Sequence, residues 1–144
     1  NTNLNEALLW ADSATSPGFG GDRVFGAWAV KAQLLEKLGR ATDATAVMKQ
    51  AMTFGNMQDL HQYGRQLLQL KKVKEALDVL KQNHANNPNQ FTTLLGLVRG
   101  YSANADYKNA LKYANLSLPL APDQPNKNNV QTMITKLKEG KDVN

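Results

Sequence analysis

The chain has 144 residues, of which 42% are hydrophobic and 20% are charged, and its formal net charge is +5. This composition is typical of one folded domain, and the absence of cysteine excludes disulfides, thiolate metal sites and a cysteine nucleophile. No apolar run approaches the roughly 18 residues of a membrane-spanning helix. The positive charge favours an acidic partner over a basic one. The missing cysteines are compatible with a cytoplasmic location and with a periplasmic or exported one.

The first third of the chain is predicted to form three helices. Apolar residues at three- and four-residue steps predict a helix over 4–15, and a Pro/Gly-rich break follows at 17–21. A second helix is predicted over 22–38, with Asp22 as its N-cap. A third is predicted over 41–54. A glycine directly after each of the last two is expected to end the helix.

The rest of the chain continues in the same way, with prolines between several of the periodic segments. No stretch alternates with a period of two for long enough to form a strand. The sequence therefore predicts an all-α protein. The further helices are expected over residues 57–70, 73–85, 90–103, 106–118 and 126–139.

One helical pattern is written twice, at a spacing of 34 residues. A fixed period with turn residues in the same places is typical of a stacked repeat array. Small residues of the pattern, such as Ala76 and Ala110, are expected to be buried where two helices cross closely. The first copy consists of Leu60, Tyr63, Gly64, Leu67, Ala76, Leu80 and Pro88, and the second of Leu94, Leu97, Val98, Tyr101, Ala110, Ala114 and Pro122.

These positions resemble the tetratricopeptide repeat family. The match is best in the first copy, whereas the second has Val98 where glycine is usual. A shorter third match carries Trp28, Ala32, Gly39 and Ala44. The resemblance implies a right-handed α-solenoid in a single domain over 1–144. Its parts would be a leading unpaired helix at 4–15, repeats at 25–56, 57–90 and 91–124, and a capping helix at 126–140.

Both ends of the chain resemble incomplete repeat units. The helix over 4–15 fits the second helix of a unit whose first helix is missing, so Leu4, Leu8 or Trp10 is expected to be exposed. The last helix is polar outside one apolar face, as a cap should be. We therefore expect this chain to be the C-terminal repeat region of a larger, exported bacterial protein.

No group of residues predicts catalysis, a metal or a cofactor. The glycine-rich loop lacks the strand and the Lys-Ser/Thr end of a phosphate-binding loop. His61 and His84, the only histidines, are too distant in sequence to indicate a metal site. The lysines of the 71–74 turn complement a helix dipole, and the aromatic residues are mostly needed for packing, so nucleic acid is not expected. We expect a non-enzymatic protein.

In the family, the first helix of each repeat lines a concave groove, and the resemblance places a set of polar residues there. Arg65 and Arg99 are 34 residues apart and would occupy the same site in successive repeats. Amides, hydroxyls and guanidinium groups suit the backbone and a carboxylate of an extended peptide. A merely solvated groove is the alternative. The predicted groove residues are Gln33, Gln58, His61, Gln62, Arg65, Gln69, Arg99 and Ser102.

The sequence thus predicts a protein-protein interaction or scaffolding module that binds an acidic or C-terminal peptide. The lysine, asparagine and arginine positions with which some family members hold C-terminal carboxylates are not reproduced. Two alternatives stay open. The chain could have a structural role, with self-association through its N-terminal face, or it could be an auxiliary domain packed on a missing N-terminal domain.

Overall fold

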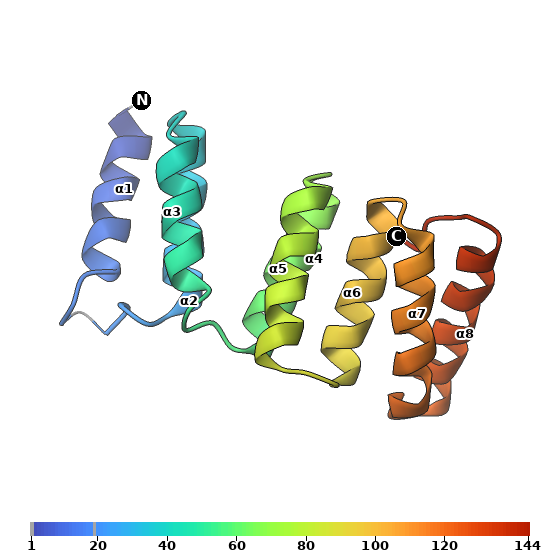
Figure 1. The fold of residues 1–144 in the computed structure, drawn as a ribbon. Coiled ribbons are helices and arrows are strands. Elements are labelled where there is room, and N and C mark those ends of the chain that lie inside the picture. Colours follow the sequence, from blue (N-terminus) through green and yellow to red (C-terminus); the bar gives the residue numbers. More distant parts are fainter. Residues whose placement is uncertain (1, 19) are drawn as a thin grey trace. The chain divides into compact units, whose positions relative to one another are not determined.

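The computed structural model describes residues 2–18 and 20–144, and every regular element among them is helical (Figure 1). The prediction of an all-α protein is confirmed, and the observed helices lie within a few residues of the expected ranges. They are α1 (Thr2–Ala14), α2 (Phe25–Lys37), α3 (Ala41–Ala51), α4 (Met57–Gln69), α5 (Val73–Asn86), α6 (Phe91–Ala103), α7 (Tyr107–Ser117), the 3-10 helix η1 (Leu118–Leu120) and α8 (Gln124–Lys138).

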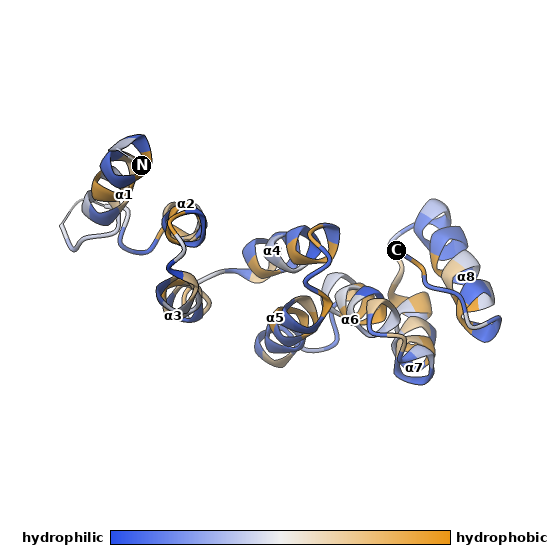
Figure 2. Ribbon diagram, turned by 90° about the horizontal axis from the view of Figure 1, so that it is seen from above, coloured by the Kyte–Doolittle hydropathy of each residue, from blue (hydrophilic) through white to orange (hydrophobic). Residues whose placement is uncertain are grey.

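The chain divides into two compact units. Unit 1 comprises residues 1–59 and holds α1, α2 and α3, whereas unit 2 comprises residues 60–144 and holds most of α4 together with α5 to α8. Within each unit, helices that follow one another in the chain pack side by side. Figure 2, which views the helices nearly end-on, shows apolar and polar residues on every helix, as expected for elements with one buried face.

In unit 1, α2 packs between α1 and α3. The buried side chains of α2 include Trp28 and Leu35, and Trp28 also makes an edge-to-face contact with Phe54. The prediction that Asp22 caps α2 is wrong. The N-cap position is Val24, which offers no side-chain hydrogen bond, and the backbone carbonyl of Asp22 instead accepts a 3.0 Å hydrogen bond from Nε1 of Trp28.

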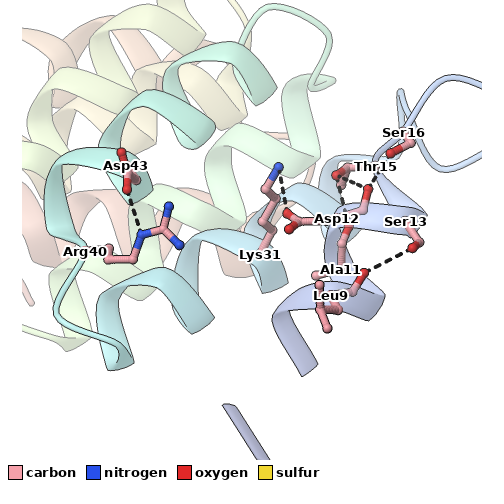
Figure 3. Close-up of polar contacts among 9 residues, drawn as sticks. All are labelled: Leu9, Ala11, Asp12, Ser13, Thr15, Ser16, Lys31, Arg40 and Asp43. Atoms are coloured by element: carbon pink, nitrogen blue, oxygen red, sulfur yellow. Dashed lines mark hydrogen bonds and ion pairs between the residues drawn. The ribbon is translucent and has the colours of Figure 1, made fainter. Parts of the chain in front are cut away.

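Polar contacts tie the end of α1 to its neighbour (Figure 3). The Nζ atom of Lys31 on α2 lies 3.2 Å from a carboxylate oxygen of Asp12 on α1. The hydroxyls of Thr15 and Ser16 donate to carbonyl oxygens of the last turn of α1, at 2.9 and 2.7 Å. These groups satisfy carbonyls that the helix leaves without an internal partner. The ion pair is half-exposed and is expected to add little stability.

In unit 2, Leu80 of α5 lies where three helices meet. Glycines of α4 and α6 face it. A Cβ added to Gly64 would lie 2.6 Å from Cδ2 of Leu80, and Cβ atoms added to Gly96 and Gly100 would lie 3.0 and 3.1 Å from its methyl groups. Leu80 itself is only 1% exposed. The three glycines therefore allow α4 and α6 to approach the same side chain of α5.

The far end of unit 2 has a continuous apolar core. Ala110 and Ala114 of α7 are fully buried against Val98 of α6 and the apolar face of α8. Ala76 on α5 is also fully buried, so the predicted burial of both repeat alanines is confirmed. The other buried members of this cluster are Val130, Met133, Leu137 and Val143.

One turn recurs after α2, α4, α6 and α8. In each case a residue with φ between 59° and 76° follows the helix, and the next residue donates its N–H to the carbonyl five positions earlier, at 2.8 to 2.9 Å. This is the hydrogen-bond pattern of a Schellman turn. The second and third occurrences lie 34 residues apart, which gives the sequence period a structural counterpart. The left-handed residues are Gly39, Lys71, Ala105 and Gly140.

Candidate binding face of helices α4 and α6

Six of the eight predicted groove residues lie in unit 2. His61, Gln62, Arg65 and Gln69 belong to α4, and Arg99 and Ser102 belong to α6. The other two, Gln33 on α2 and Gln58 in the first turn of α4, belong to unit 1 and are exposed. The site described below is confined to unit 2.

Arg65 and Arg99 line one hollow of about 210 Å³ on the surface of unit 2. We call it the arginine hollow. The side chain of Arg65 is exposed, whereas that of Arg99 is half-buried. Helical periodicity explains their proximity, because each arginine occupies the same position of its repeat. The complete lining is Arg65, Leu68, Gln69, Lys71, Arg99 and Asn144.

The electrostatics of the hollow are those of an unneutralised cationic site. Burial lowers the pKa of Arg99 from its ordinary value, and the nearby charge of Arg65 lowers it further. No ion pair joins either guanidinium group to a carboxylate within residues 2–18 and 20–144. A bound anion would relieve the repulsion between the two arginines.

His61 lies next to this pair, in the seam between α4 and α6. A Cβ added to Gly96 of α6 would lie 3.5 Å from Nδ1 of His61. Nδ1 is buried and has no hydrogen-bond partner in the described part of the chain. Burial lowers the pKa of His61, and the charges of Arg65 and Arg99 lower it further. The imidazole is therefore expected to be neutral at physiological pH and to form part of the wall of the seam.

The structure adds one cation that the sequence argument assigned elsewhere. Lys71 was attributed to a solvated turn, yet it lines the arginine hollow. It reaches this place because it is the left-handed residue of the turn after α4, with φ of 61°. Its position directly after an arginine-bearing helix is the only sequence signal that points to it, and left-handed backbone at a lysine is uncommon.

Ser102 does not line an open groove, contrary to the sequence prediction. It is only 1% exposed, and residues 141–144 cover it. Its hydroxyl donates a 2.6 Å hydrogen bond to Oδ1 of Asp142 and accepts one of 2.9 Å from the backbone N–H of Val143. The covering residues are 40 and 41 positions away in the chain, and no helical pattern in the sequence indicated them.

The arrangement suits the binding of anions rather than bond chemistry. Three cationic side chains converge, with the amide of Gln69 beside them. Among the residues that the structure describes, no group of three His, Cys, Asp or Glu side chains could hold a metal ion. None of the described helices has the length and hydropathy needed to cross a membrane.

Comparison with known proteins gives no match: no family model fits the chain, and neither a curated protein nor a solved structure is significantly similar to it. The functional argument therefore depends on the residues and their geometry.

Proposed function

We propose that the chain is a non-enzymatic protein-binding or scaffolding module of the tetratricopeptide repeat type, and that the α4–α6 face of unit 2 binds an extended acidic segment of a partner. The arginine hollow would hold a carboxylate of that segment. The exposed amides of Gln62 and Gln69 would hydrogen-bond its backbone. In this proposal the helices form a right-handed solenoid, and α8 caps it.

The observation that carries the proposal is the placement of Arg65 and Arg99 in one hollow without a carboxylate partner among the described residues. Two like charges held close together are unfavourable unless a counter-charge joins them. Guanidinium groups bind carboxylates with two parallel hydrogen bonds, which combines affinity with orientation. A solvated surface lysine would provide no comparable geometry.

The recurrent turn and the close helix crossings support the architectural part of the proposal. The left-handed residues Lys71 and Ala105 are separated by the sequence period, and the alanines of the same repeats are fully buried. These features are consistent with successive units that repeat one helix-turn-helix conformation. First helices that recur on one side of the array would bring equivalent side chains into a row.

A peptide-binding measurement tests this function. The probe is a fluorescent peptide of eight residues in which glutamate and alanine alternate, and its affinity is read by fluorescence anisotropy. Replacing both arginines, Arg65→Ala with Arg99→Ala, is expected to weaken binding tenfold or more, because a hydrogen bond to a charged group contributes about 1.5–3 kcal/mol. The remaining affinity should also depend less on salt.

The matched control removes two exposed lysines from other helices of unit 2, Lys74→Ala on α5 and Lys108→Ala on α7. It has the same net charge as the double arginine variant, so a merely non-specific attraction would weaken equally in both. Equal affinities for the two double variants, with both proteins folded by circular dichroism, would contradict the proposed site. A glutamine version of the peptide should bind neither protein tightly.

A second candidate function is self-association through unit 1. It is supported by Leu9 and Trp10 of α1, which are 67% and 78% exposed although both are large and apolar. Pairing of two copies of α1 would remove this surface from water. Sedimentation of the wild type and of Trp10→Ser over a range of concentrations separates the two candidates, because a monomeric wild type leaves only the peptide-binding role.

A further inference from the structure

Residues 141–144 behave differently from the residues that follow the other recurrent turns. After Gly39, Lys71 and Ala105 the chain enters a second helix directly, at α3, α5 and α7. After Gly140 it forms no helix and instead runs onto α6, whose Ser102 it covers. We call residues 141–144 the strap.

The strap is held by three kinds of contact that a bound peptide would also use. The carboxylate of Asp142 accepts from the hydroxyl of Ser102, and Val143 is only 9% exposed because it packs into the apolar cluster of α6, α7 and α8. The side-chain amide of Asn144 donates a 2.9 Å hydrogen bond to the backbone carbonyl of Arg99. A charged group, an apolar anchor and a backbone contact therefore lie on consecutive residues.

The carboxylate of Asp142 is itself strongly solvated by protein donors. Burial alone would raise its pKa, but hydrogen bonds from Ser102, Asn144 and Val143 together lower it below the ordinary value of 3.8. Two of these donors belong to the strap, so the bent backbone of residues 142–144 helps to hold the charge. The third, Ser102, belongs to α6 and would remain available to another carboxylate.

The strap also adjoins the arginine hollow, because Asn144 forms part of its lining together with Arg65 and Arg99. A partner segment that extended from the arginines along α6 would reach Ser102 only by displacing the strap. The two ends of this face thus differ. One carries cations without a carboxylate partner among the described residues, and the other already holds a carboxylate of the same chain.

We propose that the Ser102 end of α6 is a subsite for an acidic residue followed by an aliphatic residue, that Asp142 and Val143 occupy it in cis, and that a partner segment with the same pattern replaces them when it binds. The inference rests on the peptide-binding role proposed above and specifies its ligand. The occupant is an acidic-aliphatic segment, because the strap shows that a carboxylate fits Ser102 and that a side chain of valine size fills the adjoining apolar site.

The test uses the strap itself as the probe. A fluorescent peptide with the sequence Glu-Gly-Lys-Asp-Val-Asn, blocked at both ends, is titrated into the full chain. Asp142→Asn removes the charge from the strap but leaves Val143 in place, and neutral hydrogen bonds are roughly half as strong as charge-assisted ones. This variant is expected to bind the peptide about tenfold more tightly than the wild type, because its subsite is more often open.

Two further variants determine whether the gain comes from the subsite. Adding Ser102→Ala to Asp142→Asn should abolish the gain, and Val143→Ser alone should reproduce it by removing the apolar anchor. A peptide with asparagine in place of aspartate should bind all the proteins weakly. Equal peptide affinities for the wild type and Asp142→Asn, or a gain that survives Ser102→Ala, would overturn the inference. Thermal melts establish that each variant is folded.

The arginine variants separate this inference from the proposed function. If Arg65→Ala with Arg99→Ala leaves the affinity for the glutamate-alanine peptide unchanged while Asp142→Asn still gains affinity for the strap peptide, the hollow fails and the subsite stands. If the arginines matter and Asp142→Asn changes nothing, the acidic-peptide site stands and the strap is only a structural cover for Ser102.

Discussion

Unit 1 and unit 2 are built from the same kind of element, yet they bury their helices differently. In unit 2 the glycines of α4 and α6 admit Leu80 into a three-helix junction, and its repeat alanines are fully buried. In unit 1, by contrast, α1 leaves Leu9 and Trp10 largely exposed. The difference shows that a helical period alone does not determine how much apolar surface is buried. Small residues at the crossings are needed as well, because only they let the helix axes approach.

The largest expected effect tests the three-helix junction. Leu80→Ala should lower the free energy of unfolding by about 2–5 kcal/mol, because it removes a fully buried side chain and leaves a cavity between three helices. Leu9→Ala in unit 1 is the matched control and should change stability by less than about 0.5 kcal/mol, since Leu9 is 67% exposed. Urea unfolding followed by circular dichroism measures both.

Amide hydrogen exchange then locates the loss. We expect Leu80→Ala to reduce protection in α4, α5 and α6, because cooperative units of structure open together. Similar losses of stability in Leu80→Ala and Leu9→Ala would mean that the two units do not differ in packing as described.

The next effect concerns the recurrent turn, where unit 1 has Gly39 and unit 2 has Ala105 at the left-handed position. Left-handed backbone costs a residue with a Cβ about 1–2 kcal/mol. Gly39→Ala should therefore destabilise the protein by about 1 kcal/mol, and Ala105→Gly should stabilise it by a smaller amount, because glycine also adds entropy to the unfolded chain. Thermal melts of the two variants should shift in opposite directions. Shifts of the same sign would show that the turns are not equivalent.

The smallest expected effect is a dependence on pH that arises in unit 2, where both histidines lie. The native pKa of His61 is lowered from 6.5 by burial and by Arg65 and Arg99. Below about pH 6.5 the unfolded chain therefore binds more protons at this residue than the folded chain does, and stability falls as the pH decreases towards the native pKa. His61→Gln should flatten this part of the profile of unfolding free energy against pH. An unchanged slope in that variant would remove His61 from the account.

Binding of an acidic peptide should weaken the same dependence. A carboxylate in the arginine hollow would offset the charges of Arg65 and Arg99, which are two of the causes that lower the pKa of His61. Direct titration of the imidazole by nuclear magnetic resonance, with and without the glutamate-alanine peptide, gives the sign of this coupling. The pKa is expected to rise when the peptide is bound.

The sequence by itself determined the parts of this protein that depend on local periodicity. The positions of the helices, the burial of Ala76 and Ala110 and the exposure of Trp10 all agree with the expectations, because side chains three and four positions apart share one face of a helix. The equivalence of Arg65 and Arg99 is also readable from the 34-residue spacing, although its use in binding is a proposal.

Only the tertiary structure decided the features that join distant residues or depend on one backbone conformation. Asp22 has the side chain of a good N-cap, but its carbonyl is engaged by Trp28 and α2 begins three residues later. Lys71 enters the arginine hollow through a left-handed turn. Ser102 is polar and lies on the expected helix, yet the strap covers it from 40 residues away. A helical pattern reports which side of a helix a residue occupies, whereas the segment that packs against that side is set by the path of the whole chain.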